Sequence, residues 1–214
     1  MRPRTVAMAA ICAGFVLACG AAALSFVPRS AARPEPSANG WTQPGVDALL
    51  AKVARSLNPS LRGKLAEAVI SESRRAGFDP LFVLGLVSVE SSFRLTVSSN
   101  RGAYGLMQLK PSTFAWISAR EPDIGAEDGA AAEDPVVDVR LAIRYVKWLE
   151  SRFHNRDDAL MAYNAGPHRL RDYKRAGGIP YSVRAYPRKV WREYRRLARI
   201  AGGRRPGIAV ASAR

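Results

Sequence analysis

Three short signals for the start of a helix constrain this chain more than any other feature. Each is a polar residue followed directly by proline: Asn58-Pro59, Asp79-Pro80 and Asp134-Pro135. The side-chain oxygen of Asn or Asp caps the free N–H groups at a helix start, and proline suits the first helical position because its missing N–H is not needed there. The middle of the chain is therefore predicted to be a series of helices.

Apolar residues at helical spacing support this division. They recur every three or four positions in the stretches 46–57, 61–70 and 139–153. Further helices are predicted at three places, from about Pro111, over 157–165 and over 183–200, whereas the acidic segment 119–134 is expected to form a loop. No stretch of useful length alternates apolar and polar residues, so we expect an all-α fold in one compact domain.

The segment that follows Asp79-Pro80 is apolar on nearly every side from Leu81 to Val89, which is typical of a helix in the middle of a bundle. Glu90 ends this run and is its one carboxylate. Burial and the negative end of the helix dipole would both raise the pKa of Glu90, as a general acid working near neutral pH requires. The alternative is a solvated glutamate at a helix end.

The cysteines and histidines exclude several kinds of site. Both cysteines, Cys12 and Cys19, lie in the N-terminal apolar run, so the rest of the chain has no thiol for a disulfide or a thiolate metal site. Two histidines, His154 and His168, are too few for a histidine-rich metal centre. We therefore expect neither a metal nor a cofactor.

The formal net charge of +15 is concentrated at the two ends of the chain. Residues 1–39 carry +3, residues 40–167 carry zero and residues 168–214 carry +12. A basic C-terminal segment of this kind is expected to contact an anionic partner, for which nucleic acid, lipid head groups and an acidic envelope polymer are the candidates. A plain solvated helix is the alternative.

The N-terminus predicts export from the cytoplasm. Arg2 and Arg4 precede an uncharged, mostly apolar run over 6–27, the pattern of a secretory signal. The run is also long enough to span a bilayer, and Val16-Leu17-Ala18-Cys19 resembles a bacterial lipobox. Cleavage near 21–23, retention as an anchor and lipidation at Cys19 therefore remain alternatives. Each places the domain in the periplasm or cell envelope, and two of them anchor it to the inner or outer membrane. No nucleic acid is expected as a partner in this location.

Short blocks around and after Glu90 resemble a known family. The chain reads Glu90-Ser91-Ser92-Phe93, then Gly105-Leu106-Met107-Gln108, then Ala162-Tyr163-Asn164-Ala165-Gly166. In order and spacing these blocks resemble the catalytic domain of the soluble-type (SLT-domain) lytic transglycosylases, bacterial relatives of goose-type lysozyme that cut the glycan strands of peptidoglycan. The resemblance implies a lysozyme-like, mainly α catalytic domain. We place this domain at 45–200, after a signal or anchor over 1–27 and a linker over 28–44, and before a basic tail over 201–214.

The family implies that Glu90 is the single catalytic acid/base. It would protonate the glycosidic oxygen that leaves C1 of N-acetylmuramic acid, and the resulting carboxylate would then take the proton of the C6 hydroxyl, which closes onto C1. The product is a 1,6-anhydro sugar, and no water is consumed. Ordinary glycosidases need two carboxylates, but no second Asp or Glu lies in any of the blocks, and the nearest one downstream is Glu121.

The same resemblance implies the substrate-binding residues. Ser99 and Gln108 would bind the N-acetyl and hydroxyl groups of the sugars that flank the cut, and Met107 would line the groove. Tyr163 would stand near the cleaved bond, and Asn164 would shape the same wall. Each has a plainer alternative: Met107 as core filler, Tyr163 as a packed ring and Asn164 as a helix cap.

One block departs from the family. Where the family commonly has Glu-Thr-Arg-x-Tyr-Val, this chain has Ser182-Val183-Arg184-Ala185-Tyr186-Pro187. Arg184 and Tyr186 match, but the acidic residue, which helps to fix the active-site tyrosine, is replaced by Ser182. Because Tyr163 would lack this support, we expect a lower enzymatic activity or a shift in the conditions at which activity is highest.

The sequence thus predicts an exported enzyme, a lytic murein transglycosylase of the carbon–oxygen lyase type, whose partner is the peptidoglycan glycan strand. A role in opening the wall for an envelope-spanning secretion apparatus is compatible with the short chain. Two alternatives remain: a hydrolytic muramidase of the lysozyme type, and a non-catalytic peptidoglycan-binding scaffold.

Overall fold

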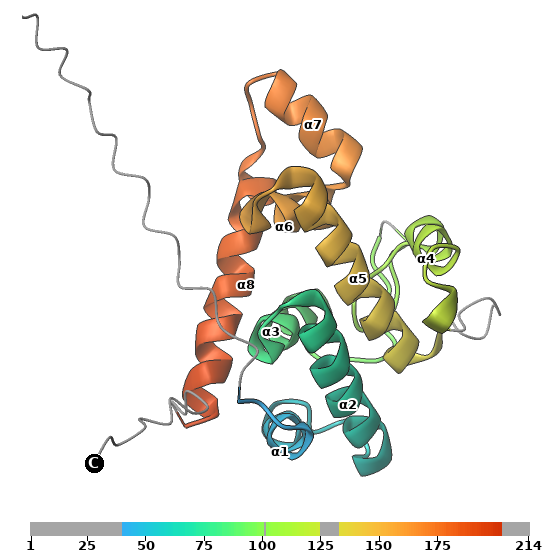
Figure 1. The fold of residues 1–214 in the computed structure, drawn as a ribbon. Coiled ribbons are helices and arrows are strands. Elements are labelled where there is room, and N and C mark those ends of the chain that lie inside the picture. Colours follow the sequence, from blue (N-terminus) through green and yellow to red (C-terminus); the bar gives the residue numbers. More distant parts are fainter. Residues whose placement is uncertain (1–39, 101, 125–132, 203–214) are drawn as a thin grey trace, which may run out of the picture. The chain divides into compact units, whose positions relative to one another are not determined.

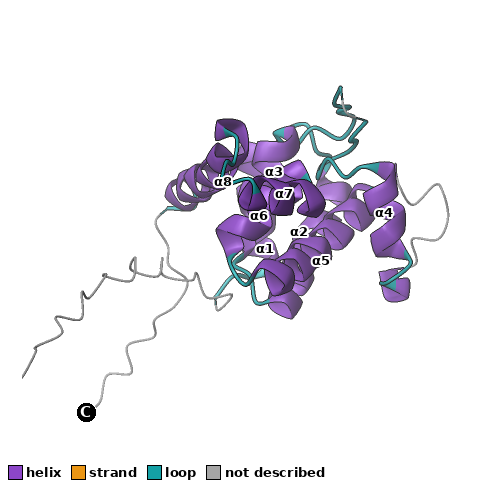
Figure 2. Cartoon of the chain, turned by 90° about the horizontal axis from the view of Figure 1, so that it is seen from above, coloured by secondary structure: helices purple, strands orange, loops and turns teal. Residues whose placement is uncertain are grey.

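The computed structural model describes residues 40–100, 102–124 and 133–202, all within one compact unit over Glu35–Arg214. This described part is helical and contains no strand, only two isolated bridges that join Tyr104 to Ser98 and to Leu109 (Figures 1 and 2). The all-α prediction is therefore confirmed. The elements are α1 (Gln43–Val53), α2 (Pro59–Ala76), α3 (Pro80–Ser91), α4 (Pro111–Ser118), the 3-10 turn η1 (Pro122–Ile124), α5 (Pro135–Phe153), α6 (Arg156–Ala165), α7 (Pro167–Arg175) and α8 (Tyr181–Ile200).

Several predicted segments fall outside this part of the chain. The expected signal or anchor over 1–27 lies outside the described residues, as do the linker up to residue 39 and the tail from residue 203. Helix α1 begins at Gln43, two residues before the expected start of the domain at residue 45. None of the helices in the described ranges is both long and apolar enough to cross a membrane.

The three helix starts predicted from a polar residue followed by proline are confirmed, and each is a capped N-terminus. The side chain of Asn58 accepts the N–H of Leu61 at 2.9 Å, and the side chain of Asp79 accepts the N–H of Leu81 at 2.7 Å. Asp134 accepts the N–H of Val136 at 2.7 Å in the same way. Each cap satisfies an N–H that the helix itself leaves free.

Helix α3 lies in the middle of the fold, with every residue from Pro80 to Ser88 buried. It packs against α8 on one side and α2 on another (Figure 1). The contact with α8 is close at Gly85, where a Cβ atom would lie 3.1 Å from the backbone nitrogen of Tyr194 and 3.3 Å from the carbonyl oxygen of Val190. This seam fixes the last turn of α3, which contains Glu90, beside the first half of α8.

Helix α5 builds the other half of the core and packs against α2, α4 and α6. Its Arg144 is buried and donates two hydrogen bonds of 3.0 Å to the carboxylate of Glu72 on α2. Arg144 also bonds Glu121 at 2.5 Å and Asp123 at 2.6 Å, next to and within η1. The segment after α4, predicted to be a loop, therefore contains a short 3-10 turn tied to α5, and residues 125–132 lie outside the described residues.

The structure contains a helix, α7, that the sequence does not predict. The sequence pattern at Gly166-Pro167 indicates only the end of a helix. Gly166, at φ 93°, does end α6, but Pro167 then occupies the first position of a new helix. Proline cannot continue a helix because it lacks the N–H that would bond to the carbonyl four residues back, but it suits the first position of the next helix, where this N–H is not needed. The apolar pattern gave no sign of α7, since Leu170 is its one buried residue.

Candidate active site

Glu90 lies half-buried in the last turn of α3 and faces a cavity of about 270 Å³. The helix ends directly after it: Ser92 has a positive φ of 53° and forms the C-cap. Four of the five expected substrate-binding residues line the same cavity. They come from three segments of the chain and are Ser99, Gln108, Tyr163 and Asn164.

The turn over 105–108 presents Gln108 to this cavity. Gly105 at φ 82° and Gln108 at φ 51° reverse the chain. The side-chain amide of Gln108 donates to the carbonyl oxygens of Val97 at 2.7 Å and Gly105 at 3.0 Å. Both N–H groups of this amide are thus used by the loop, and its oxygen is the atom left to accept a hydrogen bond from a ligand.

Met107 contradicts the expectation that it lines the groove. Its side chain is 0% exposed, lies in the hydrophobic core and does not reach the cavity. Successive residues of the turn face opposite ways, so that Gln108 points out while Met107 points in. Met107 instead acts through its backbone: its carbonyl oxygen accepts the hydroxyl of Tyr163 at 2.6 Å, and its N–H donates to Asp138 at 2.9 Å.

Tyr186 is a site residue to which the sequence gave no role. It is buried on α8, and its hydroxyl donates a hydrogen bond to the carboxylate of Glu90. Burial raises the pKa of Glu90 to about 7, although the hydrogen bond from Tyr186 opposes this rise, and the nearby charge of Asp138 adds to it. Glu90 therefore exists in both the acid and the carboxylate form near neutral pH. The one signal in the sequence was the match of Tyr186 to the family's last block.

Asp138 on α5 is a second carboxyl group that the sequence did not indicate. It is 3% exposed and accepts the N–H groups of Met107 and Leu106. Burial raises its pKa to about 7. It lies behind the turn rather than in the cavity, and a Cβ atom on Gly105 would lie only 2.7 Å from its Oδ2. Asp138 therefore holds the backbone of the turn that presents Gln108.

Tyr163 is held by a residue other than the one at position 182. Ser182 is exposed in the first turn of α8, and the Tyr163 hydroxyl is held by the carbonyl oxygen of Met107. Among the described residues, no group of three or more His, Cys, Asp or Glu side chains is placed to hold a metal ion.

A comparison of the chain against known families identifies the family to which it belongs. The family model described as "Transglycosylase SLT domain" matches residues 67–179, more than half of the chain. The protein belongs to this SLT-domain family. Its curated relatives include the soluble lytic murein transglycosylase of Escherichia coli K12, which is 29% identical over 93 residues, or 43% of this chain and 14% of that protein.

Similar solved structures show the same fold. An inactive mutant of the lytic transglycosylase Slt from Pseudomonas aeruginosa matches with a TM-score of 0.57 and 22% identity, over 75% of this chain and 30% of that one. The 70-kDa soluble lytic transglycosylase of Escherichia coli matches with a TM-score of 0.56 and 23% identity, over 77% of this chain and 29% of that one. This chain thus spans less than a third of the length of each of these relatives.

Proposed function

We propose that this protein is a lytic transglycosylase that cleaves the β-1,4 bond between N-acetylmuramic acid and N-acetylglucosamine in peptidoglycan. Membership of the SLT-domain family supports this activity. The observation on which the proposal chiefly rests is Glu90, an acid with a pKa of about 7 that faces a cavity lined by sugar-compatible polar groups. A general acid is most effective when its pKa lies near the working pH.

In the first step, protonated Glu90 gives its proton to the glycosidic oxygen, and the bond from this oxygen to C1 of the muramic acid breaks. In the second step, the C6 hydroxyl oxygen of the same sugar bonds to C1, and the Glu90 carboxylate takes the hydroxyl proton. Glu90 returns to its starting form, and the muramic acid ends as a 1,6-anhydro sugar. We assign the contacts that hold the sugars to Ser99, Gln108, Tyr163 and Asn164, whose polar atoms lie around Glu90.

The arrangement of carboxylates supports this route over hydrolysis. Among the described residues that line the cavity, Glu90 is the one carboxylate. Asp138 is close, but it is buried behind the turn and occupied by two backbone N–H groups. An inverting hydrolase would need a second carboxylate in the cleft to activate water. A nucleophile supplied by the substrate needs none.

The test is digestion of purified peptidoglycan sacculi by the full-length protein and by its Glu90→Gln variant, with released fragments read by mass spectrometry. We expect fragments that are lighter than hydrolytic products by one water, and a loss of at least about 10²-fold in rate for the variant. Fragments that contain the added water would instead establish a muramidase. Binding to sacculi without any release would establish a scaffold.

The location of the protein is a further part of the proposal. The basic, then apolar N-terminus supports export to the periplasm or cell envelope. Exposed basic side chains on α8 support a contact with an anionic membrane surface or envelope polymer, and they are Arg184, Arg188, Lys189, Arg192, Arg195 and Arg199. A place beside an envelope-spanning secretion apparatus, where the wall needs a local gap, fits this combination. Fractionation of cells that express the full-length chain tests the location.

A further inference from the structure

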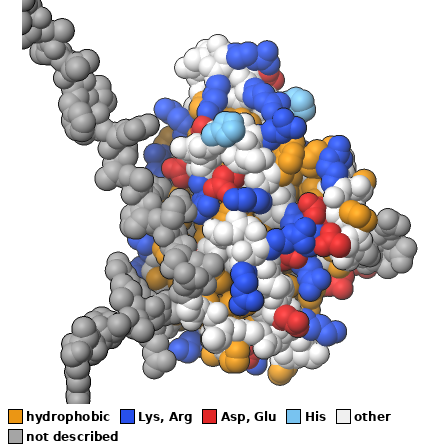
Figure 3. Space-filling view, viewed as in Figure 1, with side chains coloured by type: hydrophobic (Ala, Val, Ile, Leu, Met, Phe, Trp, Pro, Cys, Tyr) orange, Lys and Arg blue, Asp and Glu red, His pale blue; other side chains and the backbone are white. Residues whose placement is uncertain are grey.

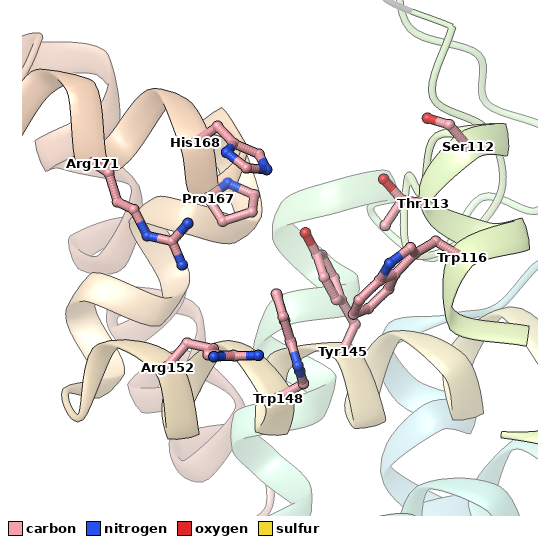
Figure 4. Close-up of a pocket in the computed structure, with 9 residues that line it drawn as sticks. All are labelled: Ser112, Thr113, Trp116, Tyr145, Trp148, Arg152, Pro167, His168 and Arg171. Atoms are coloured by element: carbon pink, nitrogen blue, oxygen red, sulfur yellow. The ribbon is translucent and has the colours of Figure 1, made fainter. Parts of the chain in front are cut away.

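A second, larger pocket adjoins the cavity that contains Glu90. Its volume is about 500 Å³, and it lies between α4 and α7 with α5 as its floor (Figure 4). The two pockets share three lining residues, Thr113, Tyr145 and Pro167. A ligand bound at Glu90 can therefore extend into the second pocket without leaving the protein surface.

The floor of the second pocket is aromatic and well packed. The rings of Tyr145 and Trp148 stack with their centroids 5.8 Å apart, and Trp116 packs edge-on against Trp148 at 4.7 Å. Each ring buries part of its surface against another, which fixes the shape of the floor. In the space-filling view, hydrophobic side chains are exposed in the region between α7 and α4 (Figure 3).

The rim of this pocket is cationic. Arg152 on α5 and Arg171 on α7 point towards the pocket, with His168 beside them (Figure 4), and no lining residue is acidic. Arg152 lies 5.3 Å from the ring centre of Trp148, and Arg171 lies 5.6 Å from that of Phe153. Within the described residues neither guanidinium has a carboxylate partner.

Nearby cations on the same two helices behave differently. Lys174 on α7 pairs with Asp158, and Lys147 on α5 pairs with Glu150 at 3.1 Å. The two arginines at the pocket are thus left with their charges directed at the space between the helices. Arginine binds carboxylates through two parallel hydrogen bonds and also lies readily against aromatic rings. The geometry fits an anionic, carboxylate-bearing ligand.

We propose that the second pocket binds the peptide that muramic acid carries on its lactyl group in peptidoglycan, through the carboxylates of that peptide. This inference rests on the proposed function. The sugar rings of the glycan strand are uncharged and give arginines nothing to neutralise, whereas the peptide is the part of the substrate that carries carboxylates. The two pockets meet at Thr113, Tyr145 and Pro167, so a substrate that binds at Glu90 can occupy both.

The test measures binding rather than cleavage. The full-length protein with Glu90→Gln is titrated calorimetrically with two soluble probes: chitotetraose, which is neutral, and a disaccharide tripeptide from peptidoglycan, which carries carboxylates. The same titrations are made after adding Arg152→Ala and Arg171→Ala together. The matched control adds Arg74→Ala, which removes an exposed arginine of α2 that lines neither pocket.

We expect the double substitution to weaken binding of the tripeptide probe about tenfold or more, since hydrogen bonds to charged groups are lost, and to leave chitotetraose binding within about twofold. Arg74→Ala should change neither affinity. Any of three results would overturn the inference. These are equal losses of affinity for both probes, no loss for either probe, and no binding of the tripeptide probe to the protein that has both arginines. Failure of the proposed function is seen separately, as absence of cleavage by the protein with Glu90 intact.

Discussion

Replacement of Tyr186 by phenylalanine tests how the fold sets the acidity of Glu90. The substitution removes one hydroxyl group from a buried ring and with it the hydrogen bond to the Glu90 carboxylate. A donor stabilises the charged form of a carboxyl group, so its loss must raise the pKa of Glu90. A hydrogen bond to a charged group contributes about 1.5–3 kcal/mol, and about 1.4 kcal/mol corresponds to one pKa unit. The pKa of Glu90, about 7 in the native protein, should therefore rise by about 1–2 units.

The assay is the pH dependence of kcat/KM on labelled glycan strands. The first step needs protonated Glu90, so kcat/KM should fall as pH rises through its pKa in the free enzyme. In Tyr186→Phe this falling limb should move about 1–2 pH units towards alkaline pH.

Tyr163→Phe is the matched control. Its hydroxyl donates to the Met107 carbonyl oxygen rather than to Glu90, so the position of the limb should stay the same even if the rate falls. A limb that does not move in Tyr186→Phe, or that moves towards acid pH, would refute the assignment of Tyr186 as the group that positions and tunes Glu90.

Two further predictions concern the turn behind the cavity. The folded-state pKa of Asp138 is raised from 3.8 to about 7, so this carboxyl group makes the protein less stable as pH rises from about 4 to 7. The free energy of unfolding, measured with urea, should differ between pH 5 and pH 8, and Asp138→Asn should reduce this difference by roughly 3 kcal/mol. An unchanged difference would contradict the argument that burial raises the pKa of Asp138. Gly105→Ala places a Cβ atom 2.7 Å from Asp138 at φ 82°, so it should cost about 2–4 kcal/mol. Gly102→Ala, also at positive φ but with open space around the Cβ position, should cost only about 1–2 kcal/mol, and equal losses for the two would argue against the contact with Asp138.

Helix starts were predictable from the sequence because the chemistry that fixes them is local. Asn58, Asp79 and Asp134 each cap N–H groups two or three residues away. Helix α7 was missed because it has one buried residue, Leu170, and hence no apolar period to detect.

The candidate site was only partly predictable. The family blocks indicated residues that the structure brings to one cavity, among them Gln108 and Tyr163. They did not indicate Asp138 or assign a role to Tyr186, because these residues come from α5 and α8, and Tyr186 is 96 positions from Glu90 in the chain. Such a pairing depends on how whole helices pack, which spacing along the sequence does not record. The prediction for Met107 was wrong because a motif does not say which way each side chain of a turn points.

The seam between α3 and α8 has a consequence for biosynthesis. A ribosome makes Glu90 and the turn of Gln108 long before it makes Tyr186, which lies on the last helix of the described chain. Until α8 has been synthesised, the side of α3 that packs against it has no cover, and the acid lacks the hydroxyl that orients it. A nascent or prematurely terminated chain thus contains the acid without its working environment. The order in which the chain is translated delays assembly of the site until nearly the whole domain exists.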